Sequence, residues 1–440
     1  MDVKDRPRHE SRPSARKPPS ARASAPVRAG ARSDVKRALL VTNIPNPYRL
    51  PLFDELSRQL DEQGVRLKVL FGGPGYRRRK WDLDFEGCRF DYDVLSSKSI
   101  EIGGDVERTL FTYGGLARHI RAFEPDVVVV TGFSPATVRL WLRSWRATLG
   151  GASLPYIVWT GSLKERPPSR WRTHLRRALV KRAAGFIAYG TTSRDYLVQL
   201  GARPEDVSIG INTVDTRFFS IETDRHRAME RHRPGRAGGE GRPLEKARIL
   251  SVGYLTPRKQ VHRLLEAVER LAATRSDFVL DIVGDGEDRA RLERHVQGRG
   301  LGEYVAFHGF KQRAELPAYL ARSRCFVFPS GFDIWGLVLV EAMAAGLPVV
   351  SSTRAGAVVD LVEDGVTGFA VDFEETEEVA KRIGWMLDNP ALAREMGMRG
   401  RGAIEEKASI ARSAEGFTEA IMRVLEKGVG RGRPQEVARP

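Results

Sequence analysis

The sequence has only two cysteines among its 440 residues, Cys88 and Cys325, and it has no long apolar run. Two thiols so far apart do not match the short spacings of a metal site, and they are typical of a reducing compartment. No segment approaches the roughly 18 apolar residues that a membrane-spanning helix needs. We therefore expect a cytoplasmic protein that lies at most peripherally at the inner face of a membrane.

Acidic residues are outnumbered by basic ones, and the excess is uneven. The formal net charge is +16. Residues 1–36, rich in Pro, Ser, Ala and Arg, and residues 429–440 are predicted to be disordered tails. The first 36 residues have no apolar core and carry acids, which excludes a secretory signal and argues against a transit peptide. A solvated extension is the preferred interpretation.

The rest of the chain alternates short apolar strands with helical patterns. The run DVVVV at 126–130 has the continuous apolar character of a buried parallel strand. Length and alternation together predict an α/β protein with two doubly wound, Rossmann-like domains. The predicted boundaries are 37–220 for the first domain, 221–246 for a charged, glycine-rich linker, 247–405 for the second domain, and 406–428 for a closing helix.

The most informative stretch is FPSGFDIWGLVLVEAMAAGLPVV at 328–350. It predicts a strand, a loop, a helix from about Gly336 to Ala345 that stops at Gly346, and another strand. Every residue of this helix between 337 and 345 is apolar except Glu341. A buried carboxylate without a partner costs several kcal/mol or becomes neutral. We therefore expect Glu341 to contact either a cation of the protein or the hydroxyls of a ligand.

This stretch resembles a known family. DIWGLVLVEAMAAG is similar to the E-x7-E signature of the retaining, two-domain nucleotide-sugar glycosyltransferases of family 4, with Asp333 in place of the first Glu and Glu341 as the second. Further segments follow in the family's order, and the resemblance covers roughly 36–428. These segments are INTVDTRFF (211–219), SVGYLTPRKQ (251–260), DIVGDGED (281–288) and VAFHGF (305–310).

The resemblance implies the GT-B fold, in which two Rossmann-like domains face a cleft. It also implies transfer of a sugar from a UDP- or GDP-sugar, with retention of configuration, to a glycan or lipid-linked acceptor in cell-surface polysaccharide or glycolipid synthesis. No metal or other cofactor is required in this family. The closing helix at 406–428 would return to the first domain.

Carried onto this sequence, the family's second Glu implies that Glu341 accepts hydrogen bonds from the ribose hydroxyls. The first position implies that Asp333 touches the donor sugar, although Asp is one methylene shorter than Glu. The alternatives are a structural ion pair for Glu341 and a helix cap or turn for Asp333. Glu341, Asp333 and Lys259 are the expected catalytic residues.

The departing diphosphate needs positive charge. The N–H groups at the helix start, Gly336 and Leu337, carry a partial positive charge, and Lys259 supplies a full one. The family has Arg directly after Gly253, where this chain has Tyr254, so Arg258 is a candidate second cation. The alternative for Arg258 and Lys259 is a solvated helix start. The complete predicted donor site is Gly253, Arg258, Lys259, His308, Phe310, Asp333, Ile334, Trp335, Gly336, Leu337 and Glu341.

The acceptor side is predicted in the first domain. Asn43, Tyr48 and Arg49 follow the first strand and face the cleft in this fold; an ordinary proline-rich turn is the alternative. No positioned base can be nominated, since Thr131 and Gly132 stand where many relatives have His. The DxD strings Asp82/Asp84 and Asp91/Asp93 are not expected to bind metal.

Residues Glu165–Arg182 contain seven basic side chains and one acid, with apolar residues at helical spacing. Such a helix binds anionic membranes, or else packs its apolar stripe on the core and leaves a basic face in water. Two rivals of the enzyme remain: a catalytically silent glycosyltransferase-like protein and a polyanion or nucleic-acid binder. The latter is disfavoured because no aromatic platform accompanies the basic residues, and no nucleic-acid partner is expected.

Overall fold

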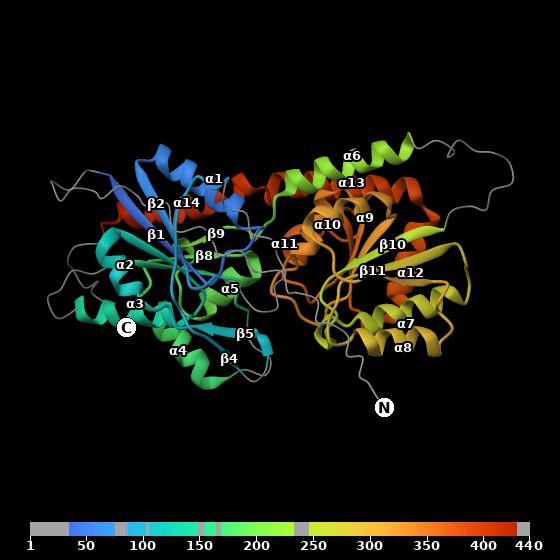
Figure 1. Cartoon of the computed structure of the whole chain (residues 1–440), viewed down its shortest axis with the longest axis horizontal. Coiled ribbons are helices and arrows are strands. Elements are labelled where there is room, and N and C mark those ends of the chain that lie inside the picture. The colour runs from blue at the N-terminus through green and yellow to red at the C-terminus, as the bar shows by residue number, and fades with distance from the viewer. Residues whose placement is uncertain are drawn as a thin grey trace, which may run out of the picture.

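Two α/β domains lie side by side in the structure, a computed structural model that describes residues 35–74, 85, 87–102, 105–147, 154–163, 169–232 and 246–428 (Figure 1). The predicted tails lie outside these residues, except for Val35 and Lys36, and Lys36 begins the first strand. Each domain contains a parallel sheet flanked by helices. The prediction of two Rossmann-like domains is therefore confirmed.

The first sheet has the strand order β3-β2-β1-β6-β7-β8-β9. Its strands are β1 (Lys36–Thr42), β2 (Val65–Phe71), β3 (Asp91–Val94), β6 (Val127–Thr131), β7 (Tyr156–Thr160), β8 (Gly185–Ala188) and β9 (Val207–Ile209), and a separate hairpin has β4 (Ser99–Ile102) and β5 (Asp105–Phe111). The helices are α1 (Leu50–Glu62), α2 (Leu116–Phe123), α3 (Pro135–Ala147), α4 (Arg170–Val180) and α5 (Thr191–Gln199). The strand order reverses between β1 and β6.

The second sheet has the order β12-β11-β10-β13-β14-β15. Its strands are β10 (Ala247–Val252), β11 (Phe278–Val283), β12 (Val305–Phe307), β13 (Cys325–Phe328), β14 (Val349–Ser352) and β15 (Gly368–Val371). The helices are α7 (Val261–Ala272), α8 (Arg289–Gly298), α9 (Leu316–Arg322), α10 (Leu337–Ala344), α11 (Val358–Leu361), α12 (Thr376–Asp388) and α13 (Pro390–Lys407). Here the order reverses between β10 and β13.

Two helices connect the domains. The closing helix α14 (Ile410–Glu426) lies against α1, β8 and β9 of the first domain, as expected. Helix α6 (Thr216–Arg231) corrects the predicted linker, because residues 221–231 continue a helix that packs on α9 and α10. Its buried stripe is short, and the charged residues around it hid the helical pattern. Residues 233–245 of the predicted linker lie outside the described residues.

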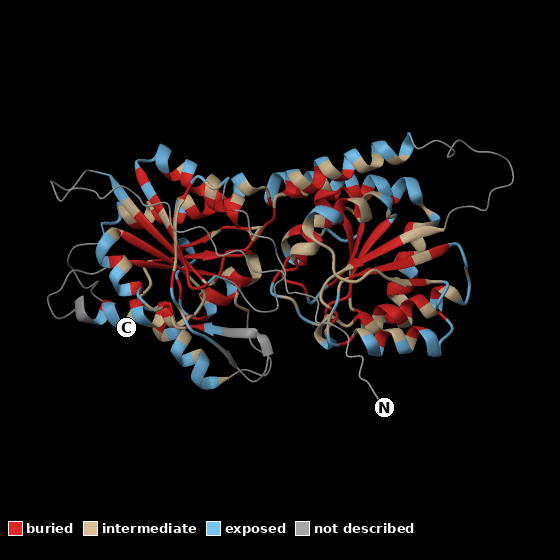
Figure 2. Ribbon diagram, in the orientation of Figure 1, coloured by how far each residue is buried: buried red, intermediate tan, exposed pale blue. Residues whose placement is uncertain are grey.

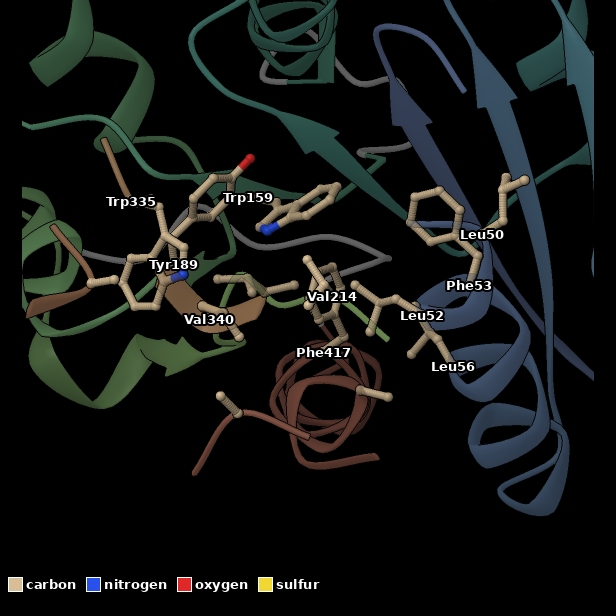
Figure 3. Close-up of a cluster of buried hydrophobic side chains, with 14 of the residues drawn as sticks. Leu50, Leu52, Phe53, Leu56, Trp159, Tyr189, Val214, Trp335, Val340 and Phe417 are labelled. Carbon is tan, nitrogen blue, oxygen red and sulfur yellow. The ribbon is translucent and has the colours of Figure 1, made fainter. Parts of the chain in front are cut away.

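A continuous apolar core joins the two domains where they meet. Figure 2 shows the buried strands in the middle of both sheets and exposed residues on the outer faces of the helices. Figure 3 shows Trp159 and Tyr189 of the first domain, Trp335 and Val340 of the second, and Phe417 of α14 in one cluster. The loop that carries Asp333 is therefore built partly against the first domain.

Candidate active site

A small hollow lies at the carboxyl edge of the second sheet, where the strand order reverses. Parallel sheets bind ligands at this place because the loops after neighbouring strands diverge there. Gly253, Tyr254 and Lys259 follow β10, and Phe328 and Pro329 end β13; all five line the hollow. Sequence positions about 75 residues apart are thus brought together at one edge.

Helix α10 begins beside this hollow. Gly336, at its N-cap, has φ of +100°, and a Cβ there would lie 2.8 Å from the ring of Phe328. Only glycine suits both the backbone and the close packing. Most of the helix is buried, and Gly346, with φ of +71°, ends it as predicted. The free N–H groups of the first turn can meet an anion.

Glu341 lies in the middle of α10, whose other side chains are all apolar, and is itself partly exposed. Among the residues that the structure describes, its carboxyl group has no hydrogen bond or ion pair. Burial raises its pKa to about 8, and the charge of Arg313 offsets part of this rise. Arg313 itself donates to Asp215 at 3.0 Å and stacks over the ring of Phe218. The structural ion pair that would have explained Glu341 is therefore not formed.

The raised pKa predicts how stability depends on pH. A folded-state pKa of about 8, against 4.5 for the ordinary group, means that the fold loses stability as pH rises from about 4.5 to 8. Between these pH values Glu341 takes up a proton when the chain folds, and Glu341→Gln removes this uptake. We expect the free energy of unfolding of the variant to exceed that of the ligand-free wild type by an amount that grows with pH, at most about 1.4 kcal/mol per unit.

Chemical denaturation at pH 5, 6.5 and 8 measures this difference. Glu363→Gln, at an exposed position of the same domain, is the control for the substitution itself. A Glu341→Gln difference that stays constant from pH 5 to 8 would show that the carboxyl group ionises normally.

Lys259 and Asp333 are brought together by the fold. The ammonium group of Lys259 donates to a carboxylate oxygen of Asp333, and it lies 5.0 Å from the ring centre of Phe328. Both side chains are largely buried. Arg258 donates to the carbonyl of Phe332 at 2.5 Å, so its guanidinium supports the loop before α10. Lys259 is therefore the cation placed at the hollow.

The glycine-rich turn after β11 supports the loop that carries Gly253. A Cβ at Gly284 would lie 1.8 Å from the carbonyl oxygen of Gly253, and one at Gly286 would lie 2.2 Å from that of Leu255. Leu255 N–H also donates to the carbonyl of Asp285 at 3.1 Å. The turn thus holds the neighbouring loop through close backbone packing.

His308 has a structural partner that the sequence did not indicate. Its Nε2 lies 2.6 Å from a carboxylate oxygen of Asp281, a fully buried residue of β11 that also accepts two hydrogen bonds from Arg248. Phe310 follows and is partly buried. The expected contact of this segment with a nucleobase would therefore come from its backbone or from Phe310.

The first domain has its own reversal point, and Asn43, Tyr48 and Arg49 follow β1 there. Tyr113 donates its hydroxyl to Asn43 Oδ1. Arg49 is buried, donates to the hydroxyl of Tyr189 at 2.6 Å and lies 4.4 Å from the ring centre of Trp159. These aromatic neighbours could not be found from the sequence, because Tyr113 lies 70 residues from Asn43 and Tyr189 lies 140 residues from Arg49 along the chain.

The remaining predictions concern the charged segments of the first domain. Asp91 pairs with Arg66 and Asp93 with Lys68, which gives the second DxD string a structural role along β3. Residues 82, 84 and 164–168 lie outside the described residues. The helix predicted at 165–182 is observed as α4, Arg170–Val180.

The family comparisons agree with this architecture. A family model described as glycosyl transferases group 1 matches residues 237–403, and one described as glycosyl transferase 4-like domain matches residues 52–210. The two matches fall on the second and first domains respectively. The site around Glu341 lies within the first of these models.

Among curated relatives, an alpha-D-kanosaminyltransferase of Streptomyces kanamyceticus is 30% identical over 52% of this chain and 57% of its own length. A GDP-mannose-dependent alpha-(1-6)-phosphatidylinositol monomannoside mannosyltransferase of Mycolicibacterium smegmatis is 34% identical over 43% of this chain and 49% of its own. The chain thus spans about half the length of these relatives. The crystal structure of Anabaena Alr3699/HepE in complex with UDP superposes with a TM-score of 0.65 at 18% identity, covering 88% of this chain and 99% of that one.

Proposed function

Because this chain is a GT-B glycosyltransferase of the family-4-like kind, we propose that it moves a sugar from a UDP- or GDP-sugar to a glycan or lipid-linked acceptor with retention of configuration. The observation that carries the proposal is Glu341, a partly exposed carboxyl group in an otherwise apolar helix, to which the described residues give no partner. Two vicinal ribose hydroxyls match the two oxygens of one carboxylate.

The remaining donor contacts follow from the positions of the cations and dipoles. Lys259 lies at the hollow beside the start of α10, so a diphosphate between them meets one full charge and the helix N-terminus. Asp333, now paired with Lys259, would exchange that contact for the sugar's hydroxyls when the diphosphate binds. The shorter reach of Asp than of Glu would then bear on which sugar fits.

Sugar transfer in this site needs no side chain of the protein as a base. The bond between the anomeric carbon and the diphosphate oxygen breaks, and a bond from that carbon to the acceptor oxygen forms on the same face. The acceptor's proton passes to the departing phosphate oxygen. The protein contributes position and electrostatic stabilisation, chiefly through Lys259 and the N–H groups of α10.

The experiment that tests this function is a panel of UDP, GDP, ADP and their sugars in thermal denaturation, followed by transfer assays with the sugar that binds. A ligand at about 100 times its Kd stabilises the fold by about 2.7 kcal/mol. Release of free nucleotide that requires an acceptor supports the enzyme. Donor binding with no turnover under any acceptor would identify a silent binding protein, and stabilisation by DNA alone would favour the polyanion binder.

The acceptor proposal has support from one surface of the first domain. Helices α3 and α4 lie at the same end of that domain (Figure 1). Neither helix contains an acid. The side chains of Leu142, Trp145, Trp171 and Leu175 are exposed by 54%, 48%, 66% and 37%, although Leu179 is fully buried. Only the C-terminal half of α4 is therefore packed on the core.

Exposed Trp and Leu beside arginines are typical of a surface that binds an anionic bilayer. Arg182 covers the ring of Trp145 at 3.8 Å, and Arg172 lies near that of Trp171 at 5.5 Å. We propose that this face docks on anionic lipid and presents lipid-linked acceptors to the cleft. Across the described residues, no helix combines the length and apolarity needed to cross a membrane.

Charge reversal tests this docking. Each basic residue near an anionic surface contributes about 1 kcal/mol, so Arg172→Glu with Arg177→Glu should weaken binding to vesicles with anionic lipid by at least tenfold. Arg225→Glu with Arg412→Glu, at equally exposed positions on α6 and α14, is the matched control and should bind like wild type. Sedimentation with the vesicles measures the binding of both double variants. If Arg172→Glu with Arg177→Glu bound the vesicles as tightly as the control does, the α3–α4 face would be excluded.

A further inference from the structure

The loop that carries Asp333 is held by a segment that also contacts the first domain. Asp333 N–H donates to the carbonyl of Arg354 at 3.2 Å, and its own carbonyl accepts from Gly356 N–H at 3.0 Å. Ala357 N–H donates to the carbonyl of Trp335 at 3.0 Å. The backbone of residues 354–357 therefore fixes the position of the loop before α10.

The same segment continues into α11, whose Asp360 reaches the other domain. Both carboxylate oxygens of Asp360 accept from Thr191 N–H at 3.1 Å, and the Thr191 hydroxyl donates to one of them. Thr191 is the first residue of α5, and the N-cap residue, Gly190, has no side chain. One domain thus supplies the N-terminal cap of a helix in the other, where a carboxylate is favoured by the helix dipole.

The loop that carries Asp333 packs directly against two glycines of the first domain. A Cβ at Gly190 would lie 2.4 Å from the Trp335 ring and 2.5 Å from a carboxylate oxygen of Asp360, and one at Gly161 would lie 2.7 Å from Ile334. Gly190 has φ of 176°, which is extended backbone that any residue adopts. Its missing side chain therefore serves the contact between domains. Figure 3 shows Trp335 beside Tyr189 at this junction.

We propose that Gly190, Thr191 and Asp360 form an interdomain latch that makes Asp360 a positioning residue for sugar transfer. The inference rests on the proposed function and adds to it that the first domain fixes the donor loop. With the latch closed, Asp333 is held from its backbone by residues 354–356 and from its side chain by Lys259. With the domains apart, Glu341 and Lys259 still bind a nucleoside diphosphate, but the sugar's contact is no longer fixed.

The test separates binding from transfer. Gly190→Ala inserts a methyl group into the closed junction without straining the backbone, so we expect kcat to fall at least tenfold while the Kd for UDP or GDP, whichever binds wild type, stays within threefold. Gly402→Ala in α13, where a Cβ meets open space, is the control and should keep both values. Small-angle X-ray scattering should show Gly190→Ala with the larger radius of gyration.

Two further variants address a purely structural effect. Asp360→Asn keeps the size of the side chain but removes its charge, and should lower kcat less than Gly190→Ala does, with Kd again unchanged. Asp360→Glu, which restores a carboxylate, should recover part of the loss. If wild type transfers sugar and all three variants match its kcat, the latch is wrong. Loss of nucleotide binding in Asp360→Asn would also overturn it, and inactivity of wild type would instead contradict the proposed function.

Discussion

Lys259→Ala is expected to lower kcat/KM for the nucleotide-sugar by about 100- to 1,000-fold. An ammonium group about 4 Å from a phosphate oxygen contributes about 4 kcal/mol at an effective dielectric near 20, and this contribution grows as charge develops on the leaving diphosphate. Among the described residues that line the hollow, Lys259 is the one with a formal positive charge. Steady-state kinetics with saturating acceptor measures the loss.

The pairing of Lys259 with Asp333 calls for variants of both residues. Lys259→Arg keeps the charge and should retain much more activity than Lys259→Ala, whereas Lys381→Ala, an exposed lysine of α12, should leave kinetics unchanged. Asp333→Asn removes the negative charge that pairs with Lys259. The variant should therefore bind nucleoside diphosphate at least as tightly as wild type while transferring sugar more slowly. If Lys259→Ala retained wild-type kcat/KM, the diphosphate would have to lie elsewhere.

Glu341→Ala is expected to lower kcat/KM for the donor by about 10- to 100-fold while leaving the ligand-free fold as stable as wild type or more so. A hydrogen bond to a charged group contributes about 1.5–3 kcal/mol, which sets the loss in binding. Removing a carboxyl group whose desolvation raises its pKa relieves a cost of folding, which sets the gain in stability.

This combination distinguishes a ligand-binding acid from a structural one. A residue retained for the fold loses stability when it is replaced, and one retained for a ligand loses binding. Met343→Ala, two residues after Glu341 in the same helix and fully buried, is the contrasting control, since it should destabilise the fold through a cavity. A Glu341→Ala protein that unfolds at lower denaturant than wild type would assign the acid to the core.

Strands were the best-predicted part of the fold. The apolar run at 126–130 is observed as β6, Val127–Thr131, and the strands predicted on either side of the helix at 336–345 are observed as β13 and β14. The buried residues of β6 and β13 are apolar without interruption, and turn residues follow each run. That signal is local, so a single sequence carries it.

Helix α13 was missed for a reason visible in the structure. Its sequence, EMGMRGRG, has three glycines that normally argue against a helix. A Cβ at Gly397 would lie 2.4 Å from the carbonyl of Gly346, and one at Gly400 would lie 3.1 Å from that of Thr367. The glycines permit close packing of α13 on the loop after α10. In α13, tertiary packing therefore outweighs the low helix propensity of glycine.

The site was predictable in its parts but not in its contacts. Glu341 stood out because one acid interrupts an apolar helix, and Gly336 and Gly346 because glycine delimits helices. The pairing of Lys259 with Asp333 joins residues 74 positions apart, and the bond from Asp360 to Thr191 spans 169. Composition and periodicity carry no information on such pairs. His308 shows the reverse case, since its sequence neighbourhood suggested a ligand and its partner is Asp281.

Calorimetric titration with UDP and GDP, and with their 2′-deoxy analogues, tests the assignment of Glu341 most directly. With the nucleotide that binds wild type, loss of the 2′-hydroxyl should weaken binding about tenfold or more. In Glu341→Ala the ribose and deoxyribose nucleotides should bind alike, because the acceptor of that hydroxyl is gone. An equal loss in both proteins would show that another group holds the ribose and would contradict the account.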